Sequence, residues 1–402
     1  MQLSVIILNY NVRYFLEQCV RSVLDAISNI DAEIIVVDNN SSDGSGMMMR
    51  ELFPYIKYID NNANVGFPKG NNIGVSHAKG EYICILNPDT VVGETTFVKL
   101  LSFASKKQKM GIVGCQLVDG KGQFLPESKR GIPTPWVSFS KAMGLNKIAP
   151  KSSFLNAYYA PHLCKDESGE VSVLVGAFMF MRKELYIELG GFDESFFMYV
   201  EDTDLSYRAI KSGYKNYYKH DVVVIHYKGE STVKDALYMQ RFRKGMQIFY
   251  KKHFSESYLF DVFMRMGSFC FMLAKKHKKV KEEKFPDKII LVSENNYLLE
   301  WGKKKWDCDM IMVSNLLKLQ NLLKRYEGLY IEIVFDGDML SNGDMILFMK
   351  SNTDRKRTFK IKPKDTSYLV GSNNSNDHGK IIKIDYQNFV NDYNKSEILL
   401  NL

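Results

Sequence analysis

Carboxylates and amides follow apolar segments at three places near the start of the chain. Asn9 and Asn11 end the apolar run of LSVIILNYN. Asp38 begins DNNSSDGS after EIIVV, and Asn87 and Asp89 flank a proline in LNPDT. Any one of these turns fits ordinary loop chemistry, because Asn, Asp and Ser are common turn residues. Repeated at the ends of several strands of one sheet, they indicate a ligand-binding site.

A second acidic cluster lies in GGFDESFFMYVEDTDLSYRAIKSGY, where Glu201, Asp202 and Asp204 stand close together. The three acids fit the first turn of a helix, which the helix dipole favours. Asp202 also fits a general base, because the apolar FFMYV before it would place this acid at a pocket wall. His226 ends another apolar segment, VVVIH, and would usually be a packed or capping residue. We single it out as a partner for Asp89.

Elements that would position these residues alternate along the first part of the chain. LSVIILNY, EIIVVD and YICIL are apolar runs typical of buried parallel strands. Helical segments separate them, and one carries apolar residues on a single face. This face consists of Leu16, Val20, Val23, Leu24 and Ile27. The alternation predicts an α/β fold with a mainly parallel sheet, whose strand ends gather the polar residues at one edge.

The glycine-rich segment NANVGFPKGNNIG excludes two nucleotide-binding classes. Its glycines stand at positions 66, 70 and 74. That spacing matches neither the dinucleotide pattern GxGxxG nor the P-loop pattern GxxxxGK[ST]. The sequence therefore indicates neither a Rossmann dehydrogenase nor a P-loop NTPase.

Composition indicates a globular protein with anionic small-molecule or membrane partners. Hydrophobic residues make up 45% and charged residues 25% of the chain, and the net charge is +8. This charge suits nucleotide diphosphates or an acidic membrane surface. Nucleic acid is not expected, because basic and aromatic residues do not interleave along one face.

The chain also carries features of a cytoplasmic protein. Its six cysteines are scattered and form no CxxC pair, which favours a reducing compartment over a disulfide framework or zinc ribbon. The start, MQLSVIILNYN, has no basic region before an apolar one, so we expect no signal peptide. No uninterrupted apolar run approaches the roughly 20 residues of a membrane-spanning helix.

Taken together, the motifs resemble those of family 2 glycosyltransferases of the GT-A fold, in particular the rhamnosyltransferase-like members of bacterial polysaccharide synthesis. The resemblance covers about residues 1–254, and the motifs come in the family's order. They are VIILNYN, VVDNNSSDGS, NVGFPKGNNIG, LNPDT, GAFMFMRKELYIELGGFDESFFMYVEDTDLSYR and HYKGEST. The set is specific, although each motif alone would be weak.

The resemblance implies a site for a pyrimidine nucleotide-sugar donor. Asp38 matches the acid that accepts a hydrogen bond from the uracil or thymine ring. Other segments match those that line the base, the ribose and the diphosphate. The nucleotide-binding residues so implied are Asn9, Tyr10, Asn11, Asp38, Asn64, Gly66, Lys69, Asn71 and Asn87.

The resemblance also implies a divalent metal and an inverting reaction. Asp89 and His226 match the metal side of the site, and Mg²⁺ or Mn²⁺ would bridge the donor diphosphate. The usual DxD pattern is Asn87-Pro88-Asp89 here, which leaves one carboxylate. Asp202 matches the catalytic base and Glu201 its neighbour. The base would deprotonate a hydroxyl of a glycan or polyprenyl-linked glycan acceptor, so one displacement inverts the anomeric centre.

Two arginines after the histidine motif fit either of two roles. Arg241 and Arg243 lie on a predicted helix. They could contact the donor diphosphate, or they could belong to a solvated basic helix face.

The remainder of the chain predicts two further parts. Residues 255–284 combine an apolar stretch with KKHKKVKEEK, which fits a helix on an anionic membrane surface as well as an ordinary packing helix. The first reading would place the protein at the inner face of the cell membrane. Residues 285–402 alternate strand and helix patterns and predict a small α/β domain. We thus expect a GT-A domain over residues 1–254, a basic linker over 255–284 and this second domain.

Two other functions remain open at this point. A sugar nucleotidyltransferase shares the nucleotide-binding architecture, but LNYNVRYF lacks the glycine- and basic-rich triphosphate loop that it should show. A non-catalytic scaffold of a polysaccharide assembly complex would fit the single-carboxylate metal motif. Donor hydrolysis without acceptor separates an enzyme from such a scaffold.

Overall fold

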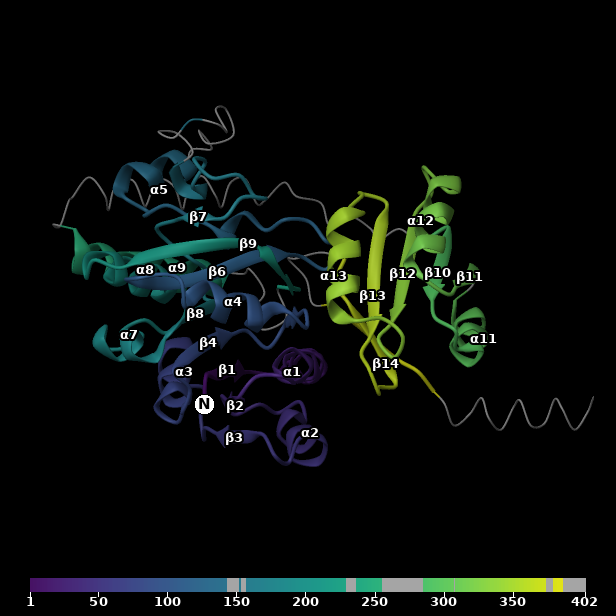
Figure 1. Ribbon diagram of the computed structural model, residues 1–402, viewed down its shortest axis with the longest axis horizontal. Coiled ribbons are helices and arrows are strands. Elements are labelled where there is room, and N and C mark those ends of the chain that lie inside the picture. Colours follow the sequence, from purple (N-terminus) through teal and green to yellow (C-terminus); the bar gives the residue numbers. More distant parts are fainter. Residues whose placement is uncertain are drawn as a thin grey trace, which may run out of the picture. The chain divides into compact units, whose positions relative to one another are not determined.

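The computed structural model describes residues 1–142, 152, 157–228, 236–254, 285–306, 308–373 and 379–385. These residues form two compact units (Figure 1). The first unit draws on the ranges 1–118, 124–226 and 230–281, and the second on 119–123, 227–229 and 282–402. The predicted linker, residues 255–284, lies outside the described residues. The predicted boundaries at residues 254 and 285 stay predictions.

The first unit is built on one mixed sheet, in the order β3-β2-β1-β4-β8-β6-β9-β5, with β7 paired to β9. Parallel pairing joins β3, β2, β1 and β4, and also β6 to β9. Strand β8 pairs antiparallel to β4 and β6, and β5 pairs antiparallel to β9. The strands are β1 (Leu3–Asn9), β2 (Ala32–Asp38), β3 (Lys57–Asp60), β4 (Tyr82–Leu86), β5 (Thr90–Val92), β6 (Met110–Val118), β7 (Gly169–Glu170), β8 (Phe178–Arg182) and β9 (Lys215–His226).

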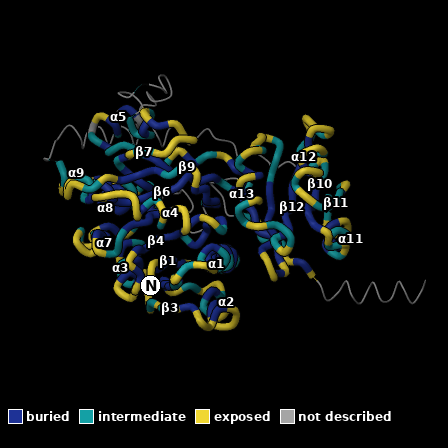
Figure 2. The backbone as a smooth tube through the Cα atoms, viewed as in Figure 1, coloured by how far each residue is buried: buried dark blue, intermediate teal, exposed yellow. Residues whose placement is uncertain are grey.

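Helices cover both faces of this sheet, which explains why its strands are apolar on both sides. In β1, Val5 and Ile7 enter one core cluster, whereas Ile6 and Leu8 enter the other. Strands β1, β4, β5 and β6 are accordingly buried along their length, whereas β3, at the edge of the sheet, is partly exposed (Figure 2). The helices are α1 (Arg13–Ile27), α2 (Ser45–Leu52), α3 (Phe67–Ser76), α4 (Thr96–Ala104), η1 (Pro126–Ser128), α5 (Pro135–Ala142), η2 (Ala157–Tyr159), α7 (Lys183–Glu188), α8 (Glu201–Lys211) and α9 (Ala236–His253).

The periodicity of the first predicted helix matches the packing of α1. Leu16, Val20 and Val23 are fully buried in the core cluster, and Leu24 and Ile27 pack against it. The α/β class and the mainly parallel sheet predicted from the sequence are confirmed.

The second unit is a smaller α/β sheet in the order β11-β10-β12-β13-β14-β15. Its first four strands are parallel and its last two pairings are antiparallel. A second, smaller domain of this class was predicted, and its presence is confirmed. Its elements are β10 (Lys288–Val292), α11 (Asn296–Lys305), β11 (Asp309–Val313), α12 (Leu316–Arg325), β12 (Ile331–Asp336), α13 (Asn342–Ser351), β13 (Arg357–Lys362), β14 (Tyr368–Gly371) and β15 (Lys380–Lys383).

Polar side chains at the carboxyl edge of this second sheet satisfy one another. Ser293, after β10, donates a hydrogen bond of 2.6 Å to Asp336 at the end of β12. Lys362, at the end of β13, lies 3.3 Å from the same carboxylate and also pairs with Asp338. This buried cluster therefore joins three neighbouring strands. Among the described helices of both units, none is long and apolar enough to cross a membrane.

Candidate active site

The first two parallel strands bring Asn9 and Asp38 side by side. The two residues are register partners at the ends of β1 and β2. The Asn9 amide donates to Asp38 over 2.6 Å, and the backbone N–H of Ser41 donates to the other carboxylate oxygen, also over 2.6 Å. Asp38 is only 1% exposed. Tyr10 and Asn11, which follow, are exposed, and Asn11 accepts a hydrogen bond from the backbone of Ser42.

The glycine-rich segment is held against β2 by an amide that sequence reasoning did not single out. The side chain of Asn39 donates to Asn64 over 3.3 Å and to the carbonyl of Gly66 over 3.2 Å. Gly66 has a φ of 85°, and a Cβ there would lie 2.5 Å from the carbonyl oxygen of Phe197. Glycine is therefore needed both for the turn and for the close approach of the two backbones.

Helix α3, which begins after Gly66, carries the other two predicted residues of this segment. Lys69 is exposed on its first turn. Asn71 is fully buried and donates to the carbonyl of Phe67, while its own carbonyl oxygen meets no partner among the described residues.

Antiparallel pairing of β5 with β9 explains how Asp89 meets His226. Thr90 and His226 are register partners, so the residue before Thr90 faces the histidine. The carboxylate Oδ1 of Asp89 lies 3.4 Å from His226 Nε2, and the Asn87 amide lies 3.3 Å from the same nitrogen. Asp89 and His226 are 3% and 6% exposed. The Thr90 hydroxyl closes the turn by donating to the carbonyl of Asn87 over 2.7 Å.

Asp202 lies in the first turn of α8, where its carboxylate is held by four donors. One oxygen accepts hydrogen bonds from Arg130 (2.6 Å) and from the backbone N–H of Gly176 (3.0 Å). The other accepts from the backbone N–H and the hydroxyl of Thr203, at 2.6 and 3.1 Å. Arg130 also donates to the carbonyl of Leu174.

The two residues before β8 link this acid to the metal motif. The backbone N–H of Asn87 donates to the carbonyl of Ala177, and Gly176, one residue earlier, donates to Asp202. A Cβ on Gly176 would touch the ring of Phe67 and the Cβ of Asp202. Hydrogen bonds, close approaches and neighbouring residues of the chain thus connect Asp38 through the glycine-rich segment to Asp202, and Asp202 to Asn87 and Asp89.

Comparison with known proteins identifies the family. Residues 4–190 match the family model described as glycosyl transferase family 2. This part of the chain belongs to that family. The family recognised from the motifs is thereby confirmed.

Similarity to known proteins supports the assignment to the rhamnosyltransferase-like branch of the family. The N-acetylglucosaminyl-diphospho-decaprenol L-rhamnosyltransferase of Mycobacterium tuberculosis is 28% identical over 259 residues, covering 61% of this chain and 83% of that protein. Rhamnosyltransferase WbbL of Escherichia coli is 25% identical over 225 residues, covering 52% and 79%. Among solved structures, the mannosyltransferase PcManGT from Pyrobaculum calidifontis aligns with a TM-score of 0.46 at 17% identity, covering 69% of this chain and 76% of that one.

In this glycosyltransferase domain, Glu201 differs from Asp202 in its surroundings. Glu201 is 6% exposed, and its Oε2 receives no hydrogen bond from any described residue. Burial, with the neighbouring charges of Asp202 and Asp204, raises the pKa of Glu201 above its ordinary value. The two adjacent carboxyl groups therefore differ in how many hydrogen bonds support their ionised form.

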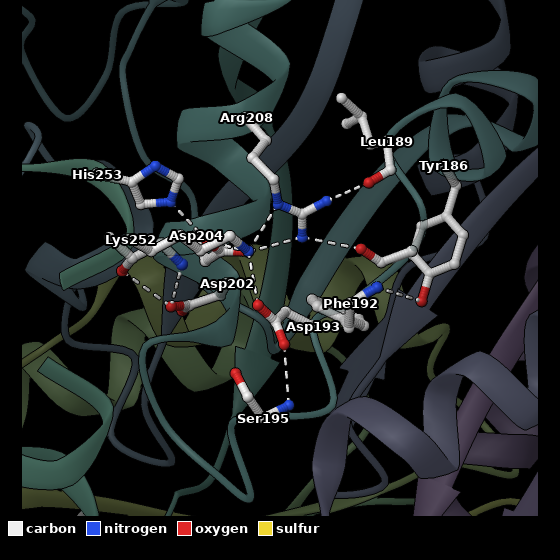
Figure 3. A network of polar contacts seen from close by, with 12 residues as sticks. Tyr186, Leu189, Phe192, Asp193, Ser195, Asp202, Asp204, Arg208, Lys252 and His253 are labelled. Carbon is white, nitrogen blue, oxygen red and sulfur yellow. Dashed lines mark hydrogen bonds and ion pairs between the residues drawn. The ribbon is translucent and has the colours of Figure 1, made fainter. Parts of the chain in front are cut away.

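Asp204, the third acid of the cluster, is the centre of a charge network (Figure 3). Its side chain is fully buried and pairs with Arg208 at 2.7 Å, Lys252 at 3.0 Å and His253 at 2.7 Å. Burial alone would raise the pKa of Asp204, but the His253 hydrogen bond and the Arg208 and Lys252 charges lower it. The network ties α8 to the end of α9. Asp204 is therefore a structural acid of the glycosyltransferase domain.

The two arginines of α9 occupy different positions. The Arg241 guanidinium lies over the ring of Phe197, 4.6 Å from its centroid, and Phe197 touches Gly66. Arg241 is thus close to the glycine-rich segment, whereas Arg243 is exposed. Their predicted contact with the diphosphate stays a prediction.

Arg130 is a second site residue that the sequence did not single out, and no motif marks it. It stands 72 residues before Asp202, in a loop without a recognisable motif. A backbone bridge to Val173 places it, through hydrogen bonds of 2.9 Å in both directions.

Proposed function

We propose that the first unit is an inverting, metal-dependent glycosyltransferase that uses a pyrimidine nucleotide-sugar donor. The donor class is a dTDP-rhamnose-like or UDP-sugar, and the acceptor is a hydroxyl of a glycan or lipid-linked glycan in cell-surface polysaccharide synthesis. The relatives support this reading, because one of them is an L-rhamnosyltransferase named for N-acetylglucosaminyl-diphospho-decaprenol, a sugar linked through a diphosphate to a lipid. An acceptor on such a lipid would bring the reaction to the inner face of the cell membrane.

The observation that carries the proposal is the connected set of residues from Asp38 to Asp89. A nucleotide, a diphosphate and an attacking hydroxyl need three kinds of group within one site: hydrogen-bonding partners for a base, cation ligands and a carboxylate. Asp38, the Asp89–His226 pair and Asp202 supply these in turn, joined by the contacts described above. They gather at the carboxyl edge of a parallel sheet, where open α/β sheets bind ligands.

The geometry at Asp89 fits a divalent cation. Two ligands of one octahedral ion with bonds of about 2.1 Å lie roughly 3 Å apart, close to the separation of the Asp89 and His226 atoms. That separation is 3.4 Å. In the described part of the chain, no group of three or more His, Cys, Asp or Glu side chains could hold a metal. Few protein ligands suit Mg²⁺ or Mn²⁺, which bind substrate phosphates as well. When bound, the ion would neutralise charge on the leaving diphosphate.

The residues of the chain then have distinct tasks. Asp38, with Asn9, Asn39 and the glycine-rich segment, would hold the nucleoside. Asp202 would accept the acceptor's hydroxyl proton as the new bond to C1 forms and the bond to the diphosphate breaks. A single displacement of this kind inverts the anomeric centre.

Turnover of a donor panel tests the proposal. We expect release of nucleoside diphosphate from a UDP- or dTDP-sugar in the presence of Mn²⁺ and a polyprenyl-diphosphate-linked acceptor, and slow donor hydrolysis without acceptor. GDP-sugars should be poor donors. A folded protein that binds nucleotides but neither hydrolyses nor transfers any donor would instead support the scaffold.

A further inference from the structure

The hydrogen-bonding capacity of Asp202 is fully used. An ionised carboxylate offers about four acceptor positions. Arg130, the backbone of Gly176 and both donors of Thr203 occupy all four. A protonated carboxyl turns one acceptor position into a donor, so it could not accept all four of these hydrogen bonds. The acceptor hydroxyl must therefore displace a donor to reach this base.

Two of the four donors are backbone groups and a third is a fixed cation. Arg130 is held by Leu174 at 3.0 Å as well as by Asp202, and its side chain is 11% exposed. The Thr203 hydroxyl makes the longest of the four contacts, at 3.1 Å, and a hydroxyl can rotate. It is the donor that can yield its position to an incoming hydroxyl, while Arg130 stays.

The charges around the pair of acids make Arg130 the cation that serves Asp202. On α8 itself, burial and the charges of Asp202 and Asp204 raise the pKa of Glu201, whereas the charge of Arg130 lowers it. Asp204 is matched by Arg208, Lys252 and His253. From η2, Tyr158 interacts with Arg130. Burial alone would lower the pKa of Arg130, but the Asp202 charge raises it above its usual value.

Glu201 is less well supported than Asp202: its own backbone N–H and the charge of Arg130 favour its ionised form, but burial outweighs both and raises its pKa. Its buried Oε2 has no partner among the described residues, although Glu201 is adjacent to Asp202 in the chain. An ionised Glu201 would place a second, unsatisfied negative charge beside Asp202, which burial makes costly.

We propose that Arg130 is a positioning residue that decides which of the two adjacent carboxyl groups is the base. It holds Asp202 ionised and oriented, and the proton stays on Glu201. In the transfer step, which rests on the proposed function, Asp202 takes the acceptor's proton, and the diphosphate leaves with the electron pair of the C1–O bond. In this role Arg130 acts through Asp202 and not directly on either substrate.

The pH dependence of turnover tests this role. Arg130→Met and Arg130→Gln remove the charge, and the Gln variant keeps a hydrogen-bond donor. We expect kcat to fall about 10–100-fold. The acidic limb of the pH profile of kcat should move up by about one pH unit or more, which is the usual effect of losing an opposite charge beside a carboxylate. Nucleotide binding by calorimetry should change less than about twofold, because a residue that acts only through the base affects turnover and not donor affinity. In Arg130→Lys, which keeps the charge, kcat should fall less and the acidic limb should move less than in the two neutral variants.

A matched control is Arg182→Met, which removes an exposed ion pair with Glu81 outside the site. Its pH profile should equal that of the unaltered protein. An unshifted acidic limb in folded Arg130→Met or Arg130→Gln would overturn the proposal.

Infrared spectroscopy gives a readout independent of turnover. We expect a protonated-carboxyl band at neutral pH that disappears in Glu201→Gln. In the double variants of Glu201→Gln with Arg130→Met or with Arg130→Gln, the remaining Asp202 should gain its proton at higher pH than in Glu201→Gln alone. If Glu201→Gln loses no band, the proposal fails, even when neutral Arg130 variants do not fold. If Asp202→Asn transfers sugar normally while the infrared result holds, the proposed function is wrong and the proton assignment stands.

Discussion

The neighbouring carboxyl groups of Glu201 and Asp202 differ in the hydrogen bonds that they accept, and this difference determines the expected kinetics. Asp202 has four donors, whereas Oε2 of Glu201 has none among the described residues. Asp202→Asn keeps the size of the side chain and removes proton acceptance. We expect roughly 10²–10⁴-fold loss of kcat, with nucleotide binding changed by less than about 1 kcal/mol, because a base acts on the transition state. Transfer assays and calorimetry measure the two quantities. Transfer at the full rate would place the base elsewhere.

Asp38 should determine which nucleobase the donor site accepts. The Asp38→Ala variant removes an acceptor that Asn9 and Ser41 also use, so nucleotide affinity should fall by about 1–3 kcal/mol for UDP and dTDP. GDP should bind weakly both to the unaltered protein and to Asp38→Ala. Asp60→Ala is the matched control, since Asp60 is the exposed register partner of Asp38 on β3. Equal affinities for UDP, dTDP and GDP in the unaltered protein would refute this assignment.

Asp89 and His226 should bind the divalent ion together. In Asp89→Ala, the gain in UDP affinity on adding Mn²⁺ should disappear, because the protein's only carboxylate in the NPD motif is lost. His226→Gln should reduce this gain. His220→Gln, a change at a half-buried histidine of the same strand, serves as control. Calorimetric titration with and without Mn²⁺ measures the effect. Undiminished sugar transfer in the presence of EDTA would contradict the proposed role of a divalent ion.

At the scale of elements, helix α8 depends on the charge network that joins it to α9. Asp204→Asn leaves Arg208, Lys252 and His253 without their shared carboxylate, so the free energy of unfolding should fall by about 3–5 kcal/mol at neutral pH. Urea denaturation measures it. Asp193→Asn, which removes a more exposed partner of Lys252, should cost about 1 kcal/mol or less.

The pH dependence of this effect has a definite sign. The pKa of Asp204 is lowered in the folded protein, so its stabilising contribution is present above the unfolded value. It is lost as pH falls through the folded value. The difference between Asp204→Asn and the unaltered protein should therefore shrink in acid, and a constant difference would argue against the network.

At the scale of the whole molecule, the contacts of the site all lie within the first unit. Among the described residues, those from Asn9 to His226 supply the hydrogen bonds and ion pairs reported above for the proposed nucleotide, metal and base positions. A chain ending at residue 254 should therefore bind UDP or dTDP with Mn²⁺ within about 1 kcal/mol, or about fivefold, of the full chain. Calorimetry on both proteins measures this. Much weaker binding by a folded fragment would show that the predicted boundary is wrong.

The sequence by itself determined the elements and the family. The apolar run of β1 and the spacing of Leu16, Val20 and Val23 can be interpreted within short windows, because burial on one or both faces repeats with the period of a strand or helix. The motifs identified the glycosyltransferase family for the same reason: each is a contiguous turn at the end of one element.

Only the tertiary structure decided which side chains meet. Arg130 reaches Asp202 across 72 residues, and His226 reaches Asp89 through the register of two antiparallel strands. Neither pairing leaves a periodic pattern, because each depends on how separate segments pack. The same holds for Asp204, which the sequence placed in an acidic first turn and the fold surrounds with cations from α8 and α9. The charge state of a buried acid is thus set by neighbours that are distant in sequence.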